Sequence, residues 1–256
     1  MIDLKELTPD EMDRLCVEKL GQKRGQGLRV AVQLFRKRVE AIDAMTDLNR
    51  PFREILKRQC TVSRLIVERS ESANDGTTKL LYRLGDGNTL EGVLIPGPDR
   101  LTLCVSTQVG CASGCRFCLT GAGGLVRDLT PGEMVNQFFA AARFAGERPV
   151  TNIVLMGTGE PLSNYNAVKK FVGTATDRCG FGFSPKKVTL STCGLAPQIM
   201  QLGNDVCINL AVSLNAPDDE TRNRLMPINK KYPLQTLLAA CKKYPMPGRR
   251  LLTFEY

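Results

Sequence analysis

Three closely spaced cysteines are the residues of this sequence best suited to chemistry. Cys111, Cys115 and Cys118 follow the spacing Cys-x-x-x-Cys-x-x-Cys. Three thiolates can bind three irons of a cubane [4Fe–4S] cluster, which leaves a fourth iron open to a substrate or cofactor that receives an electron. The spacing therefore predicts a cluster that takes part in a reaction rather than one that only stores electrons.

A zinc site is the alternative interpretation of short cysteine spacings. Structural zinc is usually bound by two Cys-x-x-Cys pairs or by cysteines together with histidines. The chain has no histidine, Cys104 lies seven residues before Cys111, and the next cysteine after Cys118 is Cys179. The pattern thus favours the cluster over zinc.

The composition is that of a globular protein kept in a reducing compartment. The chain has 256 residues, of which 43% are apolar, enough for one large domain and a small one. Ten cysteines without a signal peptide indicate free thiols, so we expect a cytoplasmic protein. No apolar run approaches the roughly 20 residues that cross a bilayer, so we expect no membrane association, and we expect a monomer.

The charge of the chain favours a polyanionic partner. The formal net charge is +9, and most of the excess lies after residue 75. Lysines and arginines that neutralise phosphates gain affinity by releasing counterions, so RNA or DNA is the expected partner class. A generically basic surface is the alternative, and composition alone does not choose between the two.

The periodicity of apolar residues changes twice along the chain. The pattern over residues 1–60 predicts a helical module. Thr8 is expected to cap its first helix, and a second helix is expected over 28–41. Residues 61–98 read as a small antiparallel sheet with a linker. From 99 to 256 strands alternate with helices, which predicts an α/β fold with a complete or partial (β/α) barrel whose active face lies at the strand carboxyl ends. The expected strands are 101–105, 152–156, 187–190, 206–214 and 250–256, and the expected helices are 131–145, 166–179, 196–202 and 233–244.

Small and polar residues recur where the expected barrel strands end. Residues 155–161 read Leu-Met-Gly-Thr-Gly-Glu-Pro, in which glycines permit close approach of a ligand and Glu160 supplies a carboxylate for an ammonium group. Ser191 and Ser213 stand at the ends of the next two strands. Hydroxyls there suit a ribose or a carboxylate, and ordinary turn capping is the alternative.

Together these motifs resemble the radical S-adenosylmethionine enzymes, whose core combines the cysteine loop with a Gly-Glu-Pro element. Segments 103–111, 156–161, 188–192 and 227–231 narrow the resemblance to the RlmN family of dual-specificity RNA methyltransferases. The similarity extends over residues 89–256, and the amino-terminal parts match the accessory domain of the family in kind.

The resemblance implies a role for individual residues. Cys111, Cys115 and Cys118 would bind the [4Fe–4S] cluster, whose open iron would be chelated by S-adenosylmethionine. Glu91 would be the proton acceptor. Cys104 would resolve a covalent protein–RNA intermediate by forming a disulfide. The positions implied to contact S-adenosylmethionine are Phe117, Gly159, Glu160, Ser191, Ser213, Leu214 and Asn215.

The resemblance also implies the reaction and the partners. The family methylates adenine C2 in 23S rRNA and tRNA, a carbon that is electrophilic and therefore unsuited to direct attack on a methyl sulfonium. One S-adenosylmethionine methylates a cysteine, a second yields a radical that activates this methyl group, and the base is taken out of its stack. An electron donor such as flavodoxin is implied as a further partner.

The sequence departs from the family pattern in two respects. It stops at Tyr256, where relatives would continue for roughly a hundred residues on the usual length of a barrel, and the methyl-carrying cysteine would lie there. We therefore expect a truncated or partial copy that cannot complete methyl transfer alone, and we expect Cys193, Cys207 and Cys241 to be small core residues. Asn215 stands where many relatives carry histidine.

Two other functions remain open from the sequence. One is methylation of adenine C8 of rRNA, as in enzymes of the antibiotic-resistance type that share the scaffold. The other is non-catalytic RNA binding by a protein that keeps a structural cluster.

Overall fold

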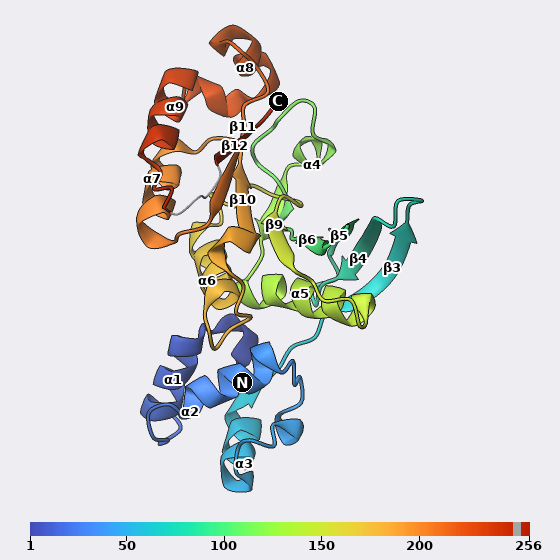
Figure 1. Cartoon of the computed structure of the whole chain (residues 1–256), viewed down its shortest axis with the longest axis vertical. Helices are drawn as coiled ribbons and strands as arrows, with labels where there is room; N and C mark the ends of the chain where they lie inside the picture. The colour runs from blue at the N-terminus through green and yellow to red at the C-terminus, as the bar shows by residue number, and fades with distance from the viewer. Residues whose placement is uncertain (248–251) are drawn as a thin grey trace.

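The computed structural model describes residues 1–247 and 252–256 and shows an α/β fold built on one large sheet (Figure 1). Of the expected strand 250–256, Arg250 and Leu251 lie outside the described residues. Within the described ranges the sheet has eight strands. In order across the sheet these are β12 (Leu252–Glu255), β11 (Asn209–Ser213), β10 (Val188–Thr192), β9 (Asn152–Leu155), β6 (Arg100–Cys104), β5 (Thr89–Gly97), β4 (Thr78–Arg83) and β3 (Ile66–Ser72).

Strands β6, β9, β10, β11 and β12 pair in parallel and alternate with helices, as the periodicity predicted. Their alternate residues, such as Leu103, Ile153, Leu190 and Leu210, are fully buried in the core that the helices cover. These helices are α5 (Pro131–Ala145), α6 (Tyr165–Thr176), α7 (Ala196–Asp205) and α9 (Leu234–Lys243). The sheet is thus the open, partial form of a (β/α) barrel.

Smaller elements connect these strands and helices. One pair of strands, β7 and β8, forms a separate antiparallel ribbon. The connecting elements are β7 (Gln108–Gly110), α4 (Leu119–Ala122), β8 (Leu125–Asp128), η4 (Pro185–Lys187), α8 (Asp219–Leu225) and η5 (Pro227–Lys230).

The antiparallel strands β3, β4 and β5 continue the barrel sheet rather than forming a sheet of their own. Strand β5 pairs with β6, with Val93 opposite Cys104 and Gly97 opposite Arg100. Residues 96–99, Pro-Gly-Pro-Asp, lie at the boundary expected between the small sheet and the barrel, and they belong instead to a tight hairpin in which Pro96 still pairs with Leu101. This pairing fixes β5 beside the first parallel strand.

The amino-terminal module is helical, and Thr8 caps its first helix as expected. Thr8 Oγ1 accepts from the Glu11 backbone N–H while the Glu11 carboxylate accepts from that of Thr8, which completes a capping box. The expected helix 28–41 ends earlier: a π-helical turn closes it at Arg36, and Arg38 takes a left-handed conformation with φ +56°. The module comprises β1 (Ile2–Asp3), η1 (Leu4–Glu6), α1 (Pro9–Glu18), α2 (Gln26–Ala31), η2 (Val32–Arg36), η3 (Ile42–Ala44), α3 (Arg50–Gln59) and β2 (Cys60–Thr61).

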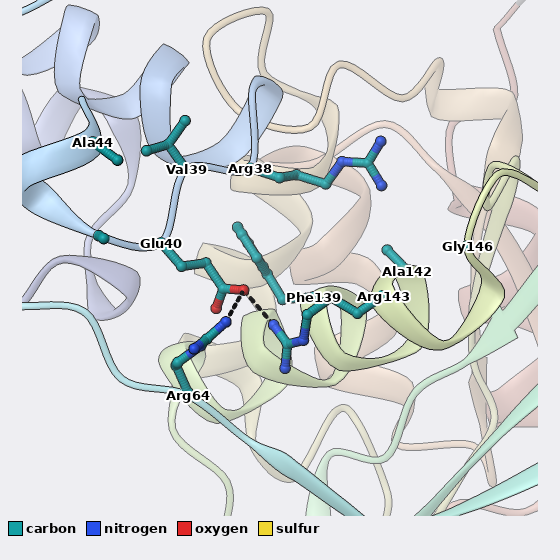
Figure 2. A pocket seen from close by; sticks show the side chains of 10 residues that line it. Arg38, Val39, Glu40, Ala44, Arg64, Phe139, Ala142, Arg143 and Gly146 are labelled. Carbon is teal, nitrogen blue, oxygen red and sulfur yellow. Dashed lines mark hydrogen bonds and ion pairs between the residues drawn. The ribbon is translucent and has the colours of Figure 1, made fainter. Parts of the chain in front are cut away.

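A buried ion pair within this module is also contacted by residues of α5. Lys5 is almost fully buried, its Nζ lies 2.8 Å from Glu40 Oε2, and it stands 4.0 Å from the centre of the Phe139 ring. The other carboxylate oxygen of Glu40 binds Arg143 of α5 and also faces Arg64 (Figure 2). Because the two parts of this contact come from distant segments, it fixes the module against the barrel.

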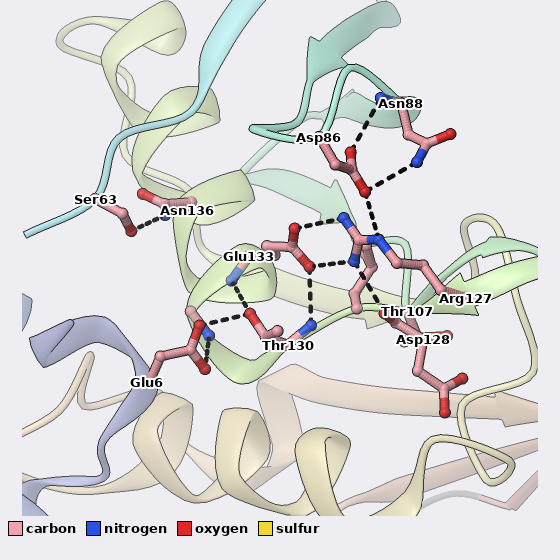
Figure 3. Close-up of polar contacts among 12 residues, drawn as sticks. Glu6, Ser63, Asp86, Asn88, Thr107, Arg127, Asp128, Thr130, Glu133 and Asn136 are labelled. Atoms are coloured by element: carbon pink, nitrogen blue, oxygen red, sulfur yellow. Dashed lines mark hydrogen bonds and ion pairs between the residues drawn. The ribbon is translucent and has the colours of Figure 1, made fainter. Parts of the chain in front are cut away.

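Arg127 of β8 makes the second junction (Figure 3). Its guanidinium binds both carboxylate oxygens of Glu133 at 2.8 Å and Asp86 in the β4–β5 turn at 2.7 Å. Thr130, which caps α5, donates to Glu6 of the amino-terminal module at 2.6 Å. The cysteine loop, α5 and both flanking parts are thereby tied together. No helix in the described part of the chain has the length and apolar character needed to span a membrane.

Candidate active site

The loop that carries the three cysteines is closed at its base by the β7–β8 ribbon. The Cys111 backbone N–H donates to the Gly124 carbonyl at 2.9 Å. Gly110 has φ +78°, and a Cβ at this position would stand 2.0 Å from the Gly124 carbonyl oxygen. Only glycine fits there, so this residue sets where the loop begins.

Cys111, Cys115 and Cys118 all line one cavity of about 320 Å³ at the carboxyl ends of the parallel strands. This volume is at the small end of the range for ligand pockets. Burial, aided by the two neighbouring thiols, raises the pKa of Cys115 to about 11. The rest of the lining is Ser113, Phe117, Leu155, Met156, Gly157, Gly159, Glu160, Pro161, Ser191, Thr192, Cys193, Ser213, Met226 and Glu255.

The cysteine loop supplies thiolates as the donors for an iron–sulfur cluster. A cluster takes each thiolate on a different iron, so the three thiols need not converge on one point. Among residues 1–247 and 252–256, no three His, Cys, Asp or Glu side chains converge closely enough to hold one metal ion. Between Cys111 and Cys118 the loop carries no acidic residue, so the thiols are its only ionisable acidic groups.

Glu160 is held rigidly at the wall of the cavity. Its side chain is only 4% exposed, and its two carboxylate oxygens accept from the backbone N–H groups of Leu162 at 2.9 Å and Cys193 at 2.7 Å. Burial raises the pKa of Glu160, and these hydrogen bonds counteract part of the rise. Since a carboxylate has about four lone-pair positions, Glu160 keeps acceptor capacity for a ligand ammonium group.

The turn that carries Gly159 is fixed from the first parallel strand. Ser106 Oγ accepts from the Thr158 backbone N–H at 2.8 Å and Gln108 Oε1 accepts from that of Glu160 at 2.8 Å. Gly159 has φ +108°, and a Cβ there would lie 2.6 Å from Gln108 Cβ. The turn therefore packs against the strand end with no room for a side chain.

Two serines meet a carboxylate that the sequence analysis did not identify. Ser191 Oγ and Ser213 Oγ donate to Glu255 Oε2 at 3.0 and 2.8 Å. Strand pairing brings the three residues together, because Ser213 lies opposite Glu255 and Ser191 is on the next strand. Nothing in the local sequence around Glu255 marks it as a site residue, since only the register of β12 brings it to the cavity.

Four of the expected site residues lie outside the cavity wall. Leu214 and Asn215 follow β11, where both backbone N–H groups donate to the Glu255 carbonyl, and the Asn215 side chain faces Met226. Glu91 and Cys104 lie on β5 and β6. Because Val93 pairs with Cys104 and alternate residues share a face, both side chains are on the sheet face that also carries the two serines.

The surroundings of Glu91 and Cys104 differ sharply. The Glu91 side chain is 51% exposed and pairs with Lys79 at 3.2 Å. Cys104 is buried, which raises the pKa of its thiol to about 11, although the Met156 backbone N–H acts in the opposite direction. All ten cysteines are free within the described chain.

One expectation about further cysteines needs correction, that for Cys207. Cys193 is buried as expected and in addition lines the cavity, with its Sγ 3.5 Å from Ser113 Oγ of the cysteine loop. Cys207 is exposed at the surface, so it is not a core residue. Cys241 is buried as expected. Periodicity could not separate these cases, because the loop approaches Cys193 from another part of the chain.

Comparison with known proteins agrees with this site. The model of the Radical SAM superfamily matches residues 105–248. The dual-specificity RNA methyltransferase RlmN of Syntrophotalea carbinolica is 51% identical over 256 residues, covering all of this chain and 68% of the relative. The RlmN of Geotalea uraniireducens is 48% identical over 255 residues, which covers all of this chain and 73% of that relative.

A solved structure gives the same result for the fold. A radical SAM methyltransferase from Sphaerobacter thermophilus superimposes with a TM-score of 0.89 at 42% identity, covering all of this chain and 76% of the other. A [4Fe–4S] cluster and S-adenosylmethionine are the cofactors of this class of enzyme, and the thiolate donor set and the adjoining cavity fit both. The chain belongs to the RlmN family of methyltransferases within the radical SAM superfamily.

Proposed function

We propose that this chain binds the cluster through Cys111, Cys115 and Cys118, holds S-adenosylmethionine beside it, and serves the methylation of adenine C2 in 23S rRNA and tRNA. The observation that carries the proposal is that the three thiols line the same cavity as Glu160 and Ser191. Residues from four separate strand ends converge there, as expected for the active face of a barrel. The names of the relatives supply the RNA substrate class.

The chain's own residues would hold and orient the cofactor. When bound, the cluster supplies one electron to S-adenosylmethionine and thereby radical chemistry. Glu160 would accept hydrogen bonds from the amino group of the cofactor beside Gly159, while Ser191 and Ser213 would contact its carboxylate or ribose. Phe117, which is 58% exposed at the cavity edge, would cover the adenine.

Glu91 and Cys104 would act at the RNA base. Glu91 is exposed and would take the proton that leaves adenine C2, a transfer that needs a carboxylate open to the substrate. Cys104 would act as the resolving thiol. Both residues lie on the sheet face that carries the cofactor residues, which supports a role in the same reaction. Leu214 and Asn215 would shape the edge of the cofactor pocket from behind β11.

Basic side chains at the junction of the two parts support an RNA partner. A cavity of about 560 Å³ is bordered by Arg38, Arg64 and Arg143, with Glu40 as its acidic residue (Figure 2). Glu40 also forms an ion pair with Lys5, so its single negative charge does not neutralise all the basic side chains at the junction. The remaining positive charge suits the phosphates of an RNA backbone.

The salt dependence of RNA binding tests this contribution. We expect Arg64→Gln to reduce the slope of log affinity against log salt by about 1. Arg83→Gln is the matched control, since Arg83 is likewise exposed and paired with a glutamate but does not border this cavity. Equal slopes in both variants and the parent protein would show that this junction does not contact RNA.

We also propose that the protein is a monomer and that it receives its electron from a donor of the flavodoxin kind.

Anaerobic reconstitution tests the ligand assignment. With iron and sulfide, the chain should acquire the visible charge-transfer absorbance of a cluster, and with a low-potential reductant it should cleave S-adenosylmethionine. Cys115→Ala should abolish both. Cys241→Ala removes another buried thiol outside the cavity and should retain both. An unchanged spectrum in Cys115→Ala would contradict the assignment.

Product and binding measurements separate the proposed function from its alternatives. In the reaction of the family a cysteine carries the methyl group, and none of the ten cysteines here is assigned that role. Cofactor cleavage and RNA binding are therefore the activities to measure on this chain. Where methylated RNA forms, mass spectrometry of the nucleosides should find the methyl group at C2, and a methyl group at C8 would favour the resistance-type activity. RNA binding without any cofactor cleavage would favour the non-catalytic alternative.

A further inference from the structure

Arg222 of α8 is the largest side chain that is completely buried in the described residues. Its guanidinium donates to three backbone carbonyls, those of Cys193, Ser213 and Leu214, at 2.8 to 3.0 Å. A fourth hydrogen bond of 2.8 Å reaches Asn229 Oδ1. The side chain therefore holds together the segments that follow β10 and β11.

All four partners of this cation are neutral. Within residues 1–247 and 252–256, no carboxylate forms an ion pair with Arg222, and the nearby Asp219 side chain is bound by Asn229 and by the Leu234 backbone N–H. A charge removed from water normally requires an opposite charge, because uncompensated burial costs several kcal/mol. Every hydrogen bond of Arg222 therefore goes to a neutral group, and the Asp219 carboxylate acts on the buried charge without direct contact.

The cysteine loop lies directly against the segment that carries Arg222. The Arg116 backbone N–H donates to the carbonyl of Leu225, in the same helix as Arg222, at 2.9 Å. Cys193, whose carbonyl binds Arg222, reaches Ser113 of the loop through its thiol. Burial lowers the pKa of Arg222, while Cys193 and Cys115 are the largest influences that raise it. The thiols are therefore within electrostatic range of the guanidinium.

We propose that Arg222 is the buried counter-charge of the iron–sulfur cluster and that it raises the reduction potential of the cluster. Three thiolates give a [4Fe–4S] cluster a net negative charge, which increases by one on reduction. A fixed cation in a poorly solvated environment stabilises the more negative state, and charge near a cluster is a known determinant of its potential. The inference rests on the proposed function, because it requires the cluster to be bound by this loop.

A redox titration of the reconstituted protein, without RNA or S-adenosylmethionine, tests the role. Arg222→Gln removes the charge, and we expect the equilibrium constant for one-electron reduction by dithionite to fall about tenfold, a shift of about 59 mV to lower potential. Arg222→Lys keeps the charge and should retain most of the potential. Arg224→Gln removes an exposed charge from the same helix and should leave it unchanged.

A second variant keeps the test decisive if Arg222→Gln does not fold. Asn229→Asp combined with Asp219→Asn retains the hydrogen bond from Arg222 and places a carboxylate against it without setting two carboxylates 2.8 Å apart, so this double variant should also lower the potential. Parent-like potentials in both variants would overturn the inference, and so would equal shifts in Arg222→Gln and Arg222→Lys, which would indicate a purely structural role. Failure of the parent chain to take up a cluster would instead contradict the proposed function.

Discussion

The Glu160 carboxylate accepts a hydrogen bond of 2.7 Å from the backbone N–H of Cys193. The contact joins the end of β9 to the end of β10 at the wall of the cavity. It also fixes the direction in which the rest of the carboxylate faces, because the second oxygen is held by the Leu162 N–H. The cofactor-facing group is thus positioned by backbone rather than by mobile side chains.

This relationship predicts an order of effects at position 160. Glu160→Asp withdraws the carboxylate by one methylene and leaves two buried N–H groups without partners, each of which costs about 1–3 kcal/mol. Glu160→Gln keeps the length and one acceptor, so its free energy of unfolding should fall less than that of the aspartate variant. Urea denaturation gives the two values, and equilibrium dialysis should show weaker S-adenosylmethionine binding in both. Glu91→Asp, at an exposed site, is the control.

Glu255 is predicted to organise the two serines of the cavity. Both hydroxyls donate to the same carboxylate oxygen, Oε2, so Glu255→Ala removes the acceptor that Ser191 and Ser213 share. We expect at least a fewfold loss of S-adenosylmethionine affinity with little change in cluster absorbance. Equilibrium dialysis measures the affinity for S-adenosylmethionine, and visible absorbance of the same sample measures the cluster content. Loss of the cluster with unchanged affinity would contradict the assignment.

The buried Lys5–Glu40 pair predicts acid sensitivity of the junction. Burial of Glu40 opposes its ionisation, but Lys5 and Arg143 outweigh this and lower its pKa. A carboxyl group whose pKa is lower in the folded protein stabilises it above the unfolded pKa of about 4.3, and this stabilisation is lost as the pH falls towards the folded pKa. Stability should therefore decline below about pH 4.3.

Glu40→Gln leaves Lys5 buried without a counter-charge and should destabilise the protein by about 3 kcal/mol at neutral pH, with a flatter acid-side slope. Chemical denaturation between pH 3 and pH 7 measures both quantities. Asp43→Asn breaks the exposed pair with Lys57 and should leave stability nearly unchanged. If the two substitutions behaved alike, the junction would not depend on the buried pair.

The buried thiol of Cys104 predicts slow and strongly pH-dependent alkylation. Because only the thiolate reacts and the pKa is about 11, the rate should rise about tenfold per pH unit between pH 8 and pH 10. Exposed Cys207 should be labelled first. Iodoacetamide labelling followed by peptide mass spectrometry gives the order. Rapid labelling of Cys104 at pH 8 would show that the thiol is open to solvent without its substrate.

The local features of this protein follow from short segments of its sequence. The periodicity predicts helix α5 at its observed bounds, and the structure shows why it begins there: Thr130 and Glu133 form a capping box, and Pro131 stands in the first turn. The cysteine spacing, the Gly-Thr-Gly-Glu turn and the serines at strand ends contain eight of the seventeen residues that line the cavity, since each motif is a short segment whose chemistry depends on its own residues. The same motifs gave the family.

Which distant residues share an environment depends on how the strands and helices pack. Glu255 reaches the serines through the register of β12, and Arg222 lies beneath the cysteine loop because α8 packs there. The hairpin at Pro96 joined β5 to the barrel sheet, where sequence signals indicated a boundary. Such contacts depend on strand pairing and on the burial of charge between segments far apart in the chain, and neither is encoded in the periodicity of any one segment.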